Sequence, residues 1–155
     1  MDPLVTSLTV PLRFVVGLVA AGIATLVMDL VMPRFTDGEL PPYVAAGVLT
    51  SRRPTDAPSG VADAVHYTAG LLTGPLFVWL TLLFEGLLSG ATLVATVLAT
   101  LLLYGLMVGF FLVVVLPRSR VADLRVPRIR RAWSISAAAY VLVLVLLVSG
   151  ATTVL

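Results

Sequence analysis

The most constraining feature of the sequence is a run of 27 residues, Ala91 to Pro117, that contains no charged side chain. A helix rises 1.5 Å per residue, so roughly 20 apolar residues cross the ~30 Å hydrocarbon core of a bilayer. The run is longer than this minimum. It therefore predicts a transmembrane helix that is tilted or that begins outside the hydrocarbon.

Three other segments have the same apolar character, and the whole chain has the composition of a membrane protein. Hydrophobic residues make up 59% of it and charged residues 12%, against about 25% charged residues in soluble domains. We predict an all-α, polytopic membrane protein, a single domain over residues 1–155 with four transmembrane helices in an antiparallel bundle. The predicted helices cover approximately residues 11–33, 61–88, 91–117 and 132–154.

The connection over residues 35–60 is long and contains several turn signals, among them Asp37-Gly38 and Pro41-Pro42. The mildly apolar segment 42–50 between them is too short to cross a bilayer and predicts a short interfacial helix. The first ten residues carry no basic residue. We therefore expect no cleavable signal peptide.

All ten basic residues are arginine, and they are distributed unevenly. Nine lie in the two connections that precede the second and fourth predicted helices, and only Arg13 lies toward the other side. Because cytoplasmic loops are enriched in basic residues, we predict that both termini lie outside the cell (plasma) membrane. The arginines accompany apolar spans without interleaved aromatic residues, so nucleic-acid binding is not expected.

Six of these arginines lie in the third connection, within fourteen residues. They predict contact with anionic lipid headgroups, since a negative membrane surface attracts juxtamembrane basic segments. The alternative, equally compatible with the pattern, is that they serve only to set topology. The six residues are Arg118, Arg120, Arg125, Arg128, Arg130 and Arg131.

Four ionisable residues in the first two predicted helices match in depth. Asp29 and His66 both lie about one turn in from the arginine-rich side, and Arg13 and Glu85 both lie near the opposite side. The separations along the two helices are ~24 Å and ~28 Å. We predict the intramembrane polar pairs Asp29–His66 and Arg13–Glu85. Such groups often mark an ion route, but pairs near the helix ends can equally neutralise each other at an interface.

Small residues recur at the spacing that lets membrane helices approach closely. Gly70 and Gly74 form one GxxxG motif, and Gly105 and Gly109 form another. In lipid, helices associate through close backbone approach. We expect these four glycines to mediate helix packing.

Motifs that would indicate an enzyme or a cofactor are missing. The chain has no cysteine and a single histidine, so we predict no metal site and no cofactor. We expect a non-enzymatic integral membrane protein, either a self-associating homo-oligomer or an accessory subunit of a membrane complex. The alternative is a small proton- or ion-linked transporter or channel that uses Asp29, His66 and Glu85.

One pattern supports a resemblance to a known family. The first predicted helix reads G-x-A-T-x-x-M-D from Gly22 to Asp29, His66 and Glu85 lie near opposite ends of the second, and the third ends in Leu116-Pro117. In these features the chain resembles the YagU-like small membrane proteins. The resemblance implies a four-helix integral membrane protein whose function is not established.

Overall fold

The computed structural model describes residues 9–154, and these form helices and turns without a strand. Residues 1–8, on which most of the signal-peptide expectation rests, lie outside the described part. Four helical segments are long and apolar enough to cross a membrane, as the sequence predicts. They begin with the α-helices α1 (Val10–Val31), α3 (Ser59–Leu87), α4 (Leu93–Gly109) and α5 (Val126–Val154).

The bounds of two long helices differ from the sequence expectation. The last helix begins at Val126 rather than near residue 132, because Pro127 falls in its first turn, where its missing N–H costs no helical hydrogen bond. The third span is not one regular helix. After α4 it continues as a π-helical segment, Phe110–Val115, and ends in the 3-10 turn Leu116–Arg118.

A short helix, α2 (Leu40–Thr50), lies where the sequence predicts one over residues 42–50. It packs into one end of the bundle, since Val44 and Ala46 are fully buried. The helix is followed by Ser51, which adopts the left-handed conformation with φ 56°.

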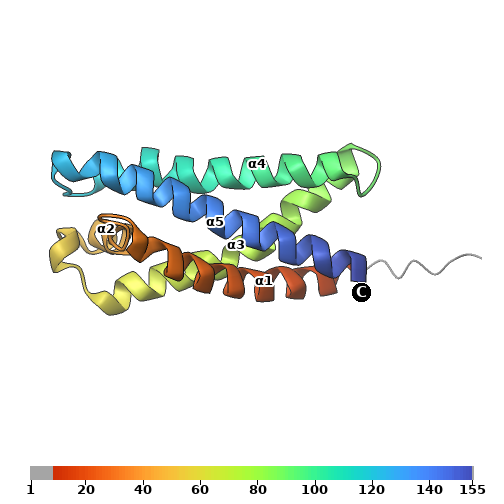
Figure 1. Cartoon of the computed structure of the whole chain (residues 1–155), viewed down its shortest axis with the longest axis horizontal. Coiled ribbons are helices and arrows are strands. Elements are labelled where there is room, and N and C mark those ends of the chain that lie inside the picture. The colour runs from red at the N-terminus through yellow and green to blue at the C-terminus, as the bar shows by residue number, and fades with distance from the viewer. Residues whose placement is uncertain (1–8, 155) are drawn as a thin grey trace, which may run out of the picture.

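The long helices are packed unevenly. The most extensive contacts join α1 to α3 and α1 to α5, whereas α4 touches α3 and α5 less. Figure 1 shows α3 and α4 meeting at the short turn near residue 90 and separating toward the other end of the bundle. That other end holds α2, the α2–α3 connection and the α4–α5 connection. We call it the arginine-rich end, because these segments, the turn after α1 and the first turns of α5 together carry nine of the ten arginines.

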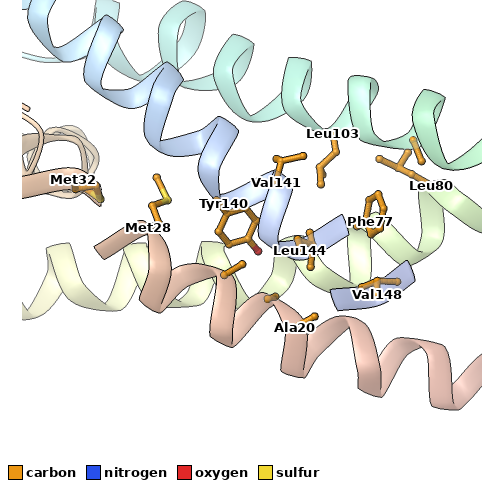
Figure 2. Close-up of a cluster of buried hydrophobic side chains, with 13 residues drawn as sticks. Ala20, Met28, Met32, Phe77, Leu80, Leu103, Tyr140, Val141, Leu144 and Val148 are labelled. Carbon is orange, nitrogen blue, oxygen red and sulfur yellow. The ribbon is translucent and has the colours of Figure 1, made fainter. Parts of the chain in front are cut away.

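The main core lies where all four long helices converge. Figure 2 shows its side chains, with Tyr140 and Leu144 of α5 near the centre, Phe77 from α3 and Leu103 from α4. All four are at most 1% exposed. The helix surface that faces outward is also apolar, including Leu30, Leu101 and Leu142 at 60–66% exposure. Soluble monomers rarely expose continuous apolar surfaces of this kind.

A second core lies at the arginine-rich end. Val44, Phe111, Leu116 and Ile129 form it, so that α2 is joined to the π-helical segment and to α5. The ring of Phe111 stacks on Trp133, with centroids 4.6 Å apart. This core anchors the connections that carry most of the arginines.

Candidate functional site: two polar pairs and an apolar cavity

The contact between α1 and α3 is close because glycine lies on both sides. A Cβ atom at Gly74 would lie 2.7 Å from Cβ of Ala21 and still nearer to the carbonyl oxygen of Gly17. Gly70 faces Thr25 in the same contact, and its carbonyl oxygen accepts a 2.6 Å hydrogen bond from the hydroxyl of Tyr140. The GxxxG motif of α3 therefore lies in a helix–helix interface.

At the arginine-rich end of this interface, Asp29 of α1 meets two side chains of α3. Nε2 of His66 lies 2.6 Å from Oδ1 of Asp29, and the hydroxyl of Tyr67 donates to Oδ2 at 2.9 Å. The His66 side chain is 11% exposed and that of Asp29 29%. Tyr67 is a partner that the sequence did not indicate, although it directly follows His66.

At the opposite end of the interface, Arg13 and Glu85 form a two-pronged ion pair. Nη1 and Nη2 of Arg13 donate to the two carboxylate oxygens of Glu85, both at 2.7 Å. The side chains are only 16% and 17% exposed. A planar guanidinium matched to a carboxylate in this way is a strong, geometrically specific contact.

Small side chains fill the α1–α3 interface between the two pairs. Gly17, Ala21 and Gly74 are buried there. The buried threonines Thr25 and Thr81 donate to carbonyls of their own helices, at 2.8 Å and 2.6 Å, and Tyr140 of α5 donates to the carbonyl of Gly70. These hydroxyls between the two pairs therefore donate to backbone carbonyls.

The second GxxxG motif has different surroundings. A Cβ atom at Gly105 or Gly109 would meet nothing within 4 Å. These two glycines therefore make no close helix contact within this chain, unlike Gly70 and Gly74.

The six arginines predicted to contact lipid headgroups fall into separate environments. Arg118 donates to the carbonyl of Val114 at 2.6 Å and so satisfies the end of the π-helical segment. Arg128, Arg130 and Arg131 are exposed on the first turns of α5. Arg120 and Arg125 line a cavity beside the α2–α3 connection.

A further feature, for which we find no sequence signal, is an apolar cavity of about 420 Å³ between α3 and α4. Residues from α1, α2, the π-helical segment and α5 complete its walls, among them Met28, Phe111 and Trp133. Leu106 and Phe110, which are 46% and 62% exposed, also line it, so the cavity reaches the outer surface of the bundle. Volume and lining are typical of sites for small apolar ligands.

The polar groups in the cavity walls are bonded within the chain. Thr73 donates to Ala69 and Tyr140 to Gly70, and the indole N–H of Trp133 donates to Met107 at 3.4 Å. His66, which also lines the cavity, engages Asp29 through Nε2. A ligand with few polar groups therefore suits these walls, since it leaves no wall hydroxyl unpaired.

Within residues 9–154, no group of three or more His, Cys, Asp or Glu side chains is placed to hold a metal ion. No protein-family model, curated protein or solved structure matches the chain.

Proposed function

We propose that this chain is a non-enzymatic integral membrane protein that binds a lipid hydrocarbon chain in the cavity between α3 and α4. In this proposal the four long helices cross the cell membrane as antiparallel neighbours, and the arginine-rich end faces the cytoplasm. The distribution of nine arginines against one supports that orientation. The resemblance to YagU-like proteins remains a prediction, and it agrees with a four-helix membrane protein.

The observation that carries the proposal is an apolar cavity that reaches the outer surface at the level of the hydrophobic spans. Its polar wall groups already have hydrogen-bond partners in the chain, so a hydrocarbon chain can fill the cavity without leaving a polar group unpaired. The π-helical segment that forms one wall adds to the argument, because π-helical turns are frequent at functional sites. Surrounding lipid would supply the ligand directly.

The two tryptophans permit a direct test in reconstituted vesicles. Trp133 lines the cavity, and Trp79 is 54% exposed on the outside of α3. In a Trp79→Phe variant, we expect phospholipids with brominated acyl chains to quench Trp133, because a chain in the cavity brings bromine against the indole. The Trp133→Phe variant keeps Trp79 as a positive control for lipid contact.

A filled cavity supplies the decisive comparison. Ala45→Phe in the Trp79→Phe background adds bulk to the cavity wall and should restore most of the Trp133 fluorescence. Ala64→Phe adds the same bulk to an exposed position of α3 outside this cavity, so its quenching should stay as in the parent. Equal quenching of Trp133 in all three proteins would refute chain binding.

Association with another membrane protein is a compatible part of this function. Gly105 and Gly109 leave a surface of α4 on which a further helix can approach closely, either from a second copy or from a complex to which this chain is accessory. We expect Gly105→Ile to weaken such association without disturbing the fold. Crosslinking in native membranes, with the wild type as reference, measures this effect.

The second candidate is proton- or ion-linked transport through Asp29, His66 and Glu85. The contact of Asp29 with both His66 and Tyr67 favours it, because ionisable groups that contact each other inside membrane spans often mark an ion route. The small-residue packing between the two polar pairs favours a structural role instead. A pH-gradient flux assay in proteoliposomes separates the two, since only transport predicts a flux that Asp29→Asn abolishes.

A further inference from the structure

The two connections at the arginine-rich end enclose a second cavity, of about 620 Å³. Arg53, Pro54 and Thr55 of the α2–α3 connection form one side, and Arg120 and Arg125 of the α4–α5 connection form another. It shares no lining residue with the cavity between α3 and α4. Any ligand of this cavity is therefore independent of the proposed hydrocarbon site.

The arginines of this cavity form no ion pair among the described residues. Within the described residues the ion pairs are Arg13–Glu85 and Asp29–His66, so the three arginines have no carboxylate within 4 Å. No acidic residue lines the cavity. Three positive charges around one space repel each other, and an anion bound between them would attract all three and offset that repulsion.

The backbone that carries the arginines is anchored. Pro54 is buried, and Val121, which follows Arg120, packs against the second core. The amide of Arg125 donates to the carbonyl of Ala122 at 2.9 Å, which closes the turn before α5. The arginines thus extend from positions that the fold holds together, although they come from connections about 70 residues apart.

We propose that this cavity binds a phosphate group through Arg53, Arg120 and Arg125. Guanidinium groups match phosphate oxygens with paired N–H donors, which makes arginine the residue suited to this ligand. Thr55 supplies a hydroxyl beside them, which in the structure donates to Asp56 at 3.3 Å. The phosphate belongs either to a lipid headgroup or to a free phosphorylated molecule.

The three arginines of the cavity differ in position from other arginines close to them in the sequence. Arg52 and Arg128 are exposed but do not line the cavity. General attraction to anions would depend on every arginine at this end. Phosphate binding in the cavity would depend on Arg53 and not on Arg52, although the two are adjacent and equally charged.

The test uses full-length protein in a neutral, phosphate-free detergent. Binding of dihexanoyl phosphatidic acid is compared with that of inorganic pyrophosphate and of dihexanoyl glycerol, which has no phosphate. We expect Arg53→Gln, Arg120→Gln and Arg125→Gln each to weaken phosphate-dependent binding about tenfold or more, as loss of a charge-assisted hydrogen bond implies. The matched variants Arg52→Gln and Arg128→Gln should change it less than about twofold.

The two probes identify the source of the phosphate. Binding of phosphatidic acid but not pyrophosphate, sensitive to the three cavity variants, assigns a lipid headgroup. Binding of pyrophosphate with the same sensitivity assigns a free phosphorylated molecule. Equal losses in Arg52→Gln and Arg53→Gln, or binding of neither probe, overturn the site. All five positions are exposed, so thermal unfolding of the ligand-free variants should match the wild type.

Discussion

The two GxxxG motifs should respond in opposite ways to the same small substitution. Gly74→Ala places a methyl group 2.7 Å from Cβ of Ala21 and closer still to the carbonyl oxygen of Gly17. Both neighbours belong to the rigid part of α1, because one is backbone and the other is a side-chain atom that no rotation can move. The helices must therefore separate to admit the methyl group.

Overpacking a tight site lowers the free energy of unfolding by about 1–3 kcal/mol. We expect Gly74→Ala to lie in the upper half of this range, at about 2–3 kcal/mol, since no flexible atom can give way. Gly70→Ala meets mainly the side chain of Thr25 and should cost less. Gly105→Ala meets nothing within 4 Å, so its unfolding free energy should equal or slightly exceed that of the wild type.

Reversible unfolding in mixed micelles, driven by a rising fraction of sodium dodecyl sulfate and followed by circular dichroism, measures these differences. We expect the order Gly74→Ala, Gly70→Ala, Gly105→Ala from least to most stable. A Gly74→Ala protein as stable as the wild type would show that α1 and α3 do not approach through this glycine. A strong loss in Gly105→Ala would show that α4 is packed differently.

Three further outcomes test other parts of the structure. Arg13→Ala and Glu85→Ala should each lower the free energy of unfolding by about 2–3 kcal/mol, because each leaves a largely shielded charge unpaired. The double variant should lose less than the sum of the two single losses, and strict additivity would contradict the pairing. Ser51→Gly should raise the unfolding free energy by about 0.5–1 kcal/mol, since glycine adopts φ 56° without strain, and a less stable variant would argue against that turn. Because the chain has no native thiol, Ser89→Cys should react with an impermeant thiol reagent from outside and Ser119→Cys should not, whereas the reverse pattern would refute the proposed orientation.

Depth in the membrane could be predicted from the sequence, because depth follows directly from counting residues along a helix. Counting suggested that Asp29 lies level with His66 and that Arg13 lies level with Glu85. In the structure the two pairs are 2.6 Å and 2.7 Å apart. The four long apolar helices were predictable for the same reason, since length and hydropathy along the chain determine them.

Rotation about the helix axes and the lateral order of the helices could not be predicted in this way. The two GxxxG motifs look alike in sequence, yet one lies in a helix contact and the other faces open space. The cavity between α3 and α4 depends on residues from α1 to α5, and the arginine cavity joins connections that are far apart in the chain. Such features arise only when all the helices are packed together.

The uneven packing of the bundle determines how variants at the two cavities can be interpreted. The close contacts that hold the fold lie between α1, α3 and α5, through Gly17, Gly74 and the central Tyr140. The arginine cavity lies between connections, away from the Gly17–Gly74 contact. The other cavity reaches Gly70 and Tyr140, but Ala45 lies on its α2 wall. Added bulk at Ala45 or loss of charge at Arg53 therefore leaves that contact intact. A change in ligand binding without a change in unfolding can then be assigned to the cavity itself, whereas a change in both would place the altered residue in the supporting core.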